Sequence, residues 1–201
     1  MIIKSVHQSS NSQTRGYALE SAHRTIDVVS SILCEAVKNV LSTSTKKNID
    51  YSSTIQKIQK VMMQPDIGCF LQFSGDYNGL LVVNFSGDAA VSIYRNYMLT
   101  MGMPEEDLAK DFTSNEVIDS IGEIINQIMG EFMRMIADKY QLIAVCGQPK
   151  VLALNNAITL TIDSDHRDNR RMAFNIEQER FQLELALEQT EFISIKEIKA
   201  V

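Results

Sequence analysis

The stretch Asp119-Ser-Ile-Gly-Glu123-Ile-Ile-Asn126-Gln-Ile-Met-Gly130 decides the fold, because it lies inside a long pattern with two unlike faces. At about 100° per residue, one arc of a helix here is apolar. The members of this arc are Val117, Ile121, Ile124, Ile125, Ile128, Phe132, Met135 and Ile136. The opposite stripe consists of Glu116, Asp119, Glu123, Asn126, Gly130 and Arg134. We therefore expect a helix with one buried face, from which Glu123 and Asn126 point together away from the core.

Capping signals place this helix and the one before it. Thr113-Ser-Asn-Glu116 has the form of a capping box, so the central helix should run over about 115–139. Ser86 can cap a preceding helix over about 88–101.

The other elements are mostly strands. Residues 49–63 fit either a short helix or a strand, and we favour a strand. The runs 67–74 and 80–85 flank a Gly/Asp/Asn loop, which predicts a β-hairpin. Further expected elements are a first long helix at about 17–42, short strands at 142–147, 151–154 and 157–162, an exposed loop at 163–169, antiparallel strands at 172–176 and 181–188, and a strand or short helix at 190–199.

This order predicts an α+β fold with a single antiparallel β-sheet and long helices packed on one face. A long helix followed by strands occurs twice, which indicates an internal duplication. We expect residues 1–15 to form a flexible N-terminal tail and residues 16–201 to form a single domain.

Composition narrows the class of protein. The net charge is −6, yet residues 105–131 contain eight acids and one base, so we expect no nucleic acid partner for that segment. The apolar runs are too short to span a bilayer, and the N-terminus lacks an apolar signal segment. Three separated cysteines in apolar surroundings (Cys34, Cys69 and Cys146) indicate buried thiols in a reducing compartment. We expect a cytoplasmic protein without a membrane partner.

Other candidate chemistry is weak. His7, His23 and His166 lack the spacing of a zinc site, and they fit ordinary surface histidines. Asp163-x-Asp165-x-x-Asp168 lacks the glycine and closing glutamate of a calcium loop. We therefore expect this chain to bind no metal and no cofactor of its own.

The central helix resembles that of the CheC/CheX/FliY family of chemotaxis phosphatases, and within it the CheX members. Residues Asp119 through Gly130 reproduce the pattern D-x-I-G-E-[IL]-x-N-x-[IV]-x-G. The upstream Phe73-Ser-Gly-Asp76-Tyr-Asn-Gly79 hairpin and Asn39-Val-Leu in the first helix are also similar to the family. The likeness covers roughly 17–188. CheC-type members carry a second E-x-x-N on the first helix. That helix here offers only Glu20-x-x-His23 and Glu35-x-x-Lys38, so the resemblance implies one site.

The resemblance implies a phosphatase whose substrate is a phosphorylated CheY-like receiver domain carrying its own Mg²⁺. Asn126 would then orient the attacking water, because an amide can accept from water and donate elsewhere. Glu123 would pair with the active-site lysine of the receiver. Gly130 would allow close approach, and Asp119 and Gln127 would flank the docking surface.

Two alternatives stay open. A non-catalytic binding or scaffold protein of the chemotaxis or flagellar-switch type would keep the fold without the activity. A small-ligand domain that reuses the fold is the third reading. A homodimer through exposed edge strands is compatible with any of these.

Overall fold

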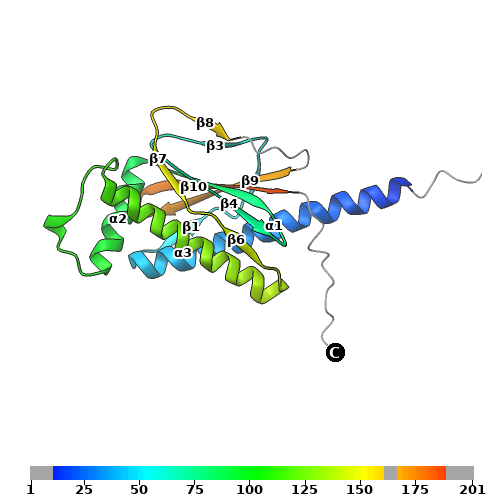
Figure 1. Cartoon of the computed structure of the whole chain (residues 1–201), viewed down its shortest axis with the longest axis horizontal. Helices are drawn as coiled ribbons and strands as arrows, with labels where there is room; N and C mark the ends of the chain where they lie inside the picture. Colours follow the sequence, from blue (N-terminus) through cyan, green and yellow to red (C-terminus); the bar gives the residue numbers. More distant parts are fainter. Residues whose placement is uncertain (1–10, 161–166, 189–201) are drawn as a thin grey trace, which may run out of the picture.

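The computed structural model describes residues 11–160 and 167–188. The elements are α1 (Asn11–Thr45), β1 (Ile49–Tyr51), β2 (Gln56–Lys57), β3 (Val61–Met63), β4 (Ile67–Gly75), β5 (Gly79–Phe85), α2 (Gly87–Thr100), a 3₁₀ turn (Glu105–Asp107), α3 (Asn115–Tyr140), β6 (Ala144–Cys146), β7 (Lys150–Ala153), β8 (Ile158–Leu160), β9 (Arg167–Ile176) and β10 (Glu179–Glu188) (Figure 1).

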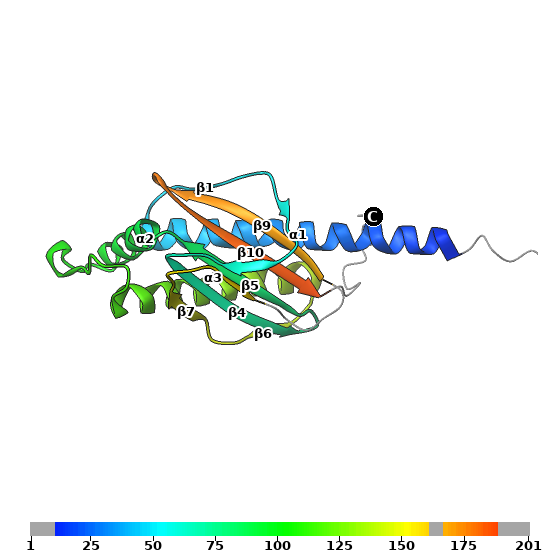
Figure 2. The same ribbon diagram turned by 90° about the horizontal axis from the view of Figure 1, so that it is seen from above.

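One antiparallel sheet of eight strands forms the centre of the fold. The strand order is β1-β9-β10-β5-β4-β6, with β2 also paired to β9 and β7 also paired to β4. Helices α1 and α3 run along one face of this sheet, and α2 lies near one end of it (Figures 1 and 2). The predicted α+β class, with an antiparallel sheet and helices on one face, is confirmed.

The predicted duplication is visible in the strand pairing. Each half consists of a long helix followed by five strands, α1 with β1–β5 and α3 with β6–β10. The hairpins β4–β5 and β9–β10 meet where β5 pairs with β10. The short strands β1 and β2 pair with β9 of the other half, and β6 and β7 pair with β4. The halves are thus interlocked rather than set side by side.

A small second sheet, which the sequence did not predict, covers the outer face of the central sheet. It consists of β3 and β8. The apolar side chains buried around it are Val61, Met63, Leu80, Val82 and Ala186. All seven residues of β5 are buried, as in strands that are covered on both faces.

Two buried polar side chains hold β3 on this outer face. Glu184, which is 0% exposed, accepts from the backbone N of Met62 at 2.7 Å and from Nε of Arg171 at 2.8 Å. Asn84 accepts from the backbone N of Gln64 at 2.7 Å and donates to the carbonyl of Met62 at 2.9 Å. Side chains of the central sheet therefore satisfy backbone groups of β3 and of the next residue, Gln64.

Several expected boundaries were wrong. Helix α1 extends beyond the predicted 17–42 at both ends, so residues 11–15 of the expected tail are helical. The predicted strand at 49–63 is three short strands. Part of the expected loop at 163–169 belongs to β9, which begins at Arg167. The histidines His7 and His166 and the expected element at 190–199 lie outside the described residues.

The cysteines differ in their surroundings. Cys34 and Cys69 are buried, and burial raises the pKa of each thiol to about 12. The expectation of three buried thiols was wrong for Cys146, which is exposed on β6. Within residues 11–160 and 167–188, none of the helices has the length and hydropathy needed to span a membrane.

The contacts of Glu184 predict a large effect on stability. Glu184→Ala leaves the amide of Met62 and the guanidinium of Arg171 without their partner, so we expect the free energy of unfolding to fall by about 2–4 kcal/mol. Urea denaturation measures this change. Glu179→Ala on the same strand, where the carboxylate is more exposed, is the control and should change stability by under about 0.5 kcal/mol. Equal effects of the two substitutions would contradict the role of Glu184.

Candidate functional site

Helix α3 is a well-anchored rod. It begins after Ser114, whose hydroxyl oxygen accepts from the backbone N of Val117 at 3.4 Å. The cap is thus one residue later than the capping box predicted from the sequence. The helix ends at Gln141, whose φ of 58° is left-handed. Phe132 fixes its inner face, with its ring centroid 6.2 Å from that of Phe73 and 6.5 Å from that of Tyr77.

The two faces of α3 lie as the sequence pattern predicted. The buried residues are Val117, Ser120, Ile121, Ile124, Ile125, Ile128, Met129, Phe132 and Ile136. Met135, which was also expected in this arc, is half-buried. On the outer face, Asp119, Glu123 and Gly130 are exposed and Asn126 is half-buried. The helix therefore presents the carboxylate and the amide on the same outer face.

A groove of about 410 Å³ lies beside this face. One wall is α3, which contributes Asp119, Glu123 and Asn126. The other wall is the segment 148–152, which includes the start of β7. Strand β7 is held in place by its pairing with β4, in which Lys150 lies opposite Phe70. The expected acid and amide thus share one concave surface with a second element.

The polar groups of Asn126 and Asp119 are free. Neither side chain forms a hydrogen bond or ion pair within the described part of the chain. An amide in this state can accept from one molecule and donate to another. An unpaired carboxylate can accept from a cation. The groove therefore offers groups for an incoming molecule.

Glu123 is held from within the protein. Nε2 of Gln127 donates to Oε1 of Glu123 at 3.1 Å and lies 3.4 Å from the hydroxyl of Tyr97 on α2. We expected Gln127 to contact a partner, but in the structure its amide is directed at Glu123 and Tyr97. Its docking role stays a prediction, while a role in orienting Glu123 has direct support from the geometry.

The charged side chains in the C-terminal half of the outer stripe are paired with one another. Arg134 donates to both Glu131, at 2.8 Å and 2.9 Å, and Asp138, at 2.6 Å. The hydrogen bond from Arg134 lowers the pKa of the Glu131 carboxyl. Since these charges are paired with one another, the unpaired carboxylate on the groove wall is that of Asp119, with Glu123 bonded to a neutral amide.

The two glycines of the motif differ. A Cβ built on Gly130 meets nothing within 4 Å, whereas one on Gly122 lies 3.5 Å from Cγ2 of Val151. Internal packing therefore does not require glycine at position 130. Because glycine weakens a helix, its presence on an exposed face suits close approach by another molecule.

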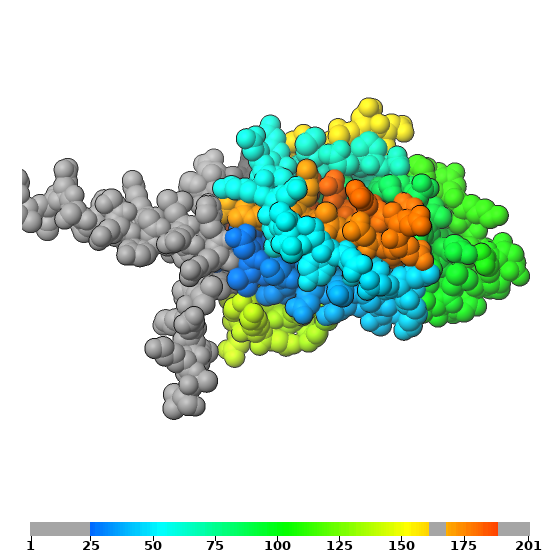
Figure 3. All heavy atoms as spheres, turned by 180° about the vertical axis from the view of Figure 1, so that it is seen from behind, coloured from blue at the N-terminus to red at the C-terminus, as the bar shows by residue number. Residues whose placement is uncertain are grey.

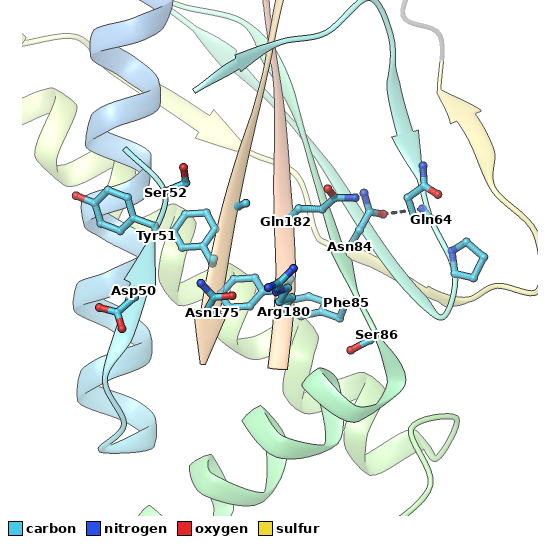
Figure 4. A pocket seen from close by; sticks show the side chains of 14 residues that line it. Asp50, Tyr51, Ser52, Gln64, Asn84, Phe85, Ser86, Asn175, Arg180 and Gln182 are labelled. Atoms are coloured by element: carbon cyan, nitrogen blue, oxygen red, sulfur yellow. Dashed lines mark hydrogen bonds between the residues drawn. The ribbon is translucent and has the colours of Figure 1, made fainter. Parts of the chain in front are cut away.

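A larger hollow of about 580 Å³ lies over the ends of β1, β9, β10 and β5. Figure 3 shows β9 and β10 (orange) between the segment of β1–β3 (cyan) and α1 (blue). Arg180 and Asn175 are register partners, with Asp50 next in the same row, and Gln182 and Asn84 form another row (Figure 4). Asp50, Asn175 and Arg180 are exposed, and the buried Asn84 is already engaged in holding β3. We therefore base the function on the groove of α3.

The α3 groove presents a carboxylate and a free amide to an incoming molecule. Glu123 can bind a cation, and Asn126 can position a water molecule or a polar ligand. Among the described residues, no group of three or more His, Cys, Asp or Glu side chains is placed to hold a metal ion.

Sequence reasoning missed the second wall of the groove and the contact of Gln127 with Tyr97. Lys150 and Leu152 belong to a separate short strand, outside the periodic pattern of α3, and Tyr97 belongs to α2. The strand was predicted at 151–154, but its register against β4 sets which residues face the helix. Periodicity within one element cannot give that register.

The comparisons with known proteins agree with this architecture. A family model described as "Protein of unknown function (DUF3334)" matches residues 20–201. The search of curated proteins gave no match. Several solved structures are similar, and three of them are described below. A chemotaxis protein CheX from Desulfovibrio desulfuricans has 18% identity and a TM-score of 0.66, covering 80% of this chain and 99% of that one.

A CheC-like superfamily protein from Shewanella sp. PV-4 also has 18% identity and a TM-score of 0.66, with 80% and 97% of the two chains covered. The CheX–CheY–BeF3–Mg²⁺ complex from Borrelia burgdorferi has 13% identity and a TM-score of 0.61, covering 79% and 96%. At these identities the likeness is one of fold. The chain has the fold of the CheC, CheX and FliY proteins, as its central helix predicted.

The open surroundings of Gly130 predict a gain in stability on substitution. Gly130→Ala should raise the free energy of unfolding by about 0.5–1 kcal/mol, because alanine favours the helix and meets no obstacle. Thermal or urea unfolding measures the change. Gly122→Ala is the matched comparison and should gain a similar amount, since its Cβ would lie at an ordinary van der Waals distance of 3.5 Å from Val151. A destabilised Gly130→Ala variant would show that the glycine has an internal structural role.

Proposed function

We propose that this chain, which belongs to the DUF3334 family of proteins of unknown function, hydrolyses the aspartyl phosphate of a CheY-type receiver domain. The observation that carries the proposal is the placement of Glu123 and Asn126 side by side on the outer face of α3, at a groove. This arrangement occurs on a fold shared with a CheX that forms a complex with CheY, BeF3 and Mg²⁺ in Borrelia burgdorferi.

Asn126 is the group proposed to act on water. Its amide is half-buried and makes no hydrogen bond within the described part of the chain. Inserted beside an aspartyl phosphate, its carbonyl oxygen can accept from a water molecule and hold it in line with phosphorus. The acyl phosphate is already a reactive group, so positioning of the water is the main task. The Mg²⁺ that helps to neutralise the phosphoryl charge would belong to the receiver.

Glu123 is the group proposed to bind the receiver. Its carboxylate is exposed one turn before Asn126 and can pair with the active-site lysine of the receiver. That ion pair would orient the docked helix and draw the lysine away from the phosphoryl group. The neighbouring acids, of which Asp119 is unpaired, favour approach of a positively charged group to this end of α3.

The central prediction concerns Asn126→Ala. We expect this substitution to remove the acceleration of dephosphorylation, a loss of about a hundredfold or more, because water is no longer held in line. Receivers from the same genome, labelled through acetyl phosphate, report the decay of the phosphoryl group with time. Asn115→Ala, at an exposed asparagine in the first turn of α3, is the matched control and should keep full activity.

Two outcomes would overturn the activity. One is a wild-type chain that speeds the decay of none of these receivers. The other is an Asn126→Ala variant as active as the Asn115→Ala control. If the wild type binds a beryllofluoride-activated receiver without changing the rate of decay, the chain is a binding protein of the same fold.

A second prediction concerns the hydroxyl of Tyr97. Tyr97→Phe removes the group that lies beside the Gln127 amide, so Glu123 should be less well oriented for the lysine of the receiver. We expect the half-saturating concentration of receiver to rise about two- to fivefold, with little change in the maximal rate, since one neutral hydrogen bond is lost. Tyr140→Phe, at the end of α3, is the control. An effect confined to the maximal rate would argue against a positioning role.

A further inference from the structure

The two walls of the α3 groove carry opposite charges. Helix α3 contributes the carboxylates of Asp119 and Glu123, and the facing segment contributes the ammonium group of Lys150. Yellow β7, which carries Lys150, lies beside green α3 in Figure 1. A molecule in this groove therefore meets anionic groups on the helix side and a cation on the strand side.

Lys150 is free to act on that molecule. Its side chain is exposed and forms no ion pair or hydrogen bond within the described part of the chain. Lys47 and Lys57, by contrast, lie 2.6 Å and 3.8 Å from carboxylate oxygens. Lys150 is thus a free cation although Asp119 and Glu123 line the same groove.

The position of Lys150 is fixed by its neighbours. It is paired with Phe70 of β4, and the next residue, Val151, packs half-buried against the core beside Gly122 of α3. The stem of the side chain therefore starts at a defined point on the groove, while its ammonium group can move by rotation of the four-carbon chain.

In the proposed function, the negative charge on the phosphoryl oxygens of the receiver loses one of its cations. When Glu123 binds the active-site lysine of the receiver, the phosphoryl oxygens lose a cation that lay beside them. Phosphoryl transfer is accelerated by cations at these oxygens, and lysine is a common point-charge ligand of phosphate. Across the groove from Glu123, Lys150 is the basic side chain available to replace the one withdrawn.

We propose, on the premise of the phosphatase function above, that Lys150 contacts the phosphoryl oxygens of the docked receiver and replaces the lysine that Glu123 removes. The oxygen of the water held by Asn126 attacks phosphorus, and the bond between phosphorus and the aspartyl oxygen breaks. The aspartate leaves as a carboxylate with the electron pair, and the proton of the water passes to solvent or phosphate. Lys150 keeps its own proton throughout and acts by charge.

The test compares Lys150→Gln, Lys150→Arg and Lys110→Gln with wild type in single-turnover dephosphorylation of the receiver. Each variant is present at a concentration that saturates the receiver. Lys110 is an exposed lysine near the start of α3 and outside the groove, so it is matched in charge. We expect Lys150→Gln to lower the maximal rate about tenfold or more, with Lys150→Arg retaining most of it. Lys110→Gln should behave as wild type. Equal rates for Lys150→Gln and Lys110→Gln would overturn the proposal.

Binding separates this proposal from the phosphatase activity itself. Lys150→Gln should weaken binding of the beryllofluoride-activated receiver about tenfold and leave binding of the unactivated receiver unchanged, because BeF3 carries the anionic charge that Lys150 contacts. If wild type does not speed dephosphorylation but Lys150→Gln still shows this selective loss of binding, the activity fails and the contact of Lys150 stands. If both forms of the receiver bind Lys150→Gln as they bind wild type, the contact is absent.

Discussion

The apolar face of α3 is buried against α1 and the inner face of the eight-stranded sheet, and this burial decides where the opposite face lies. Each of its isoleucines, with Val117 and Phe132, gains about 1.5–3 kcal/mol when it leaves water. A rotation of the helix that exposed three or four of them would cost about 5–10 kcal/mol. That is the whole stability of many domains. Glu123 and Asn126 are therefore held outward by residues that take no part in binding or chemistry.

The same constraint explains why the architecture could be predicted from the sequence. A period of 3.6 over 115–139 gave α3 to within a residue at its C-terminal end, and the alternation at 181–188 gave β10. Features that depend on contacts between distant segments were missed. The strand β3 lies on the outer face because Glu184 and Asn84 bind its backbone, and neither residue signals this in its local sequence. The exposure of Cys146 was missed for the same reason, because it depends on the position of β6 at the edge of the sheet.

The candidate site divides in the same way. The outer stripe of α3 follows from one helix and was predicted residue by residue. The groove requires two elements, and its strand side depends on the register in which Lys150 lies opposite Phe70. Shifting the register of β7 by one residue would turn every one of its side chains to the other face of the sheet. The positions of Glu123 and Asn126 can therefore be predicted from the sequence of one helix. The position of Lys150 follows only from the strand pairing of the folded sheet.

The interlocked duplication bears on the number of sites. Helices α1 and α3 head equivalent halves, so the fold offers two outer faces of similar shape. On α1 the exposed positions Glu35 and Lys38 are of opposite charge, and such neighbours three residues apart reduce the field that each presents. Among the described residues that line the α3 groove, the basic side chain lies on the facing strand, where an incoming group can lie between it and the acids. The two outer faces thus differ by a few outward side chains rather than by the fold, since either set leaves the core unchanged.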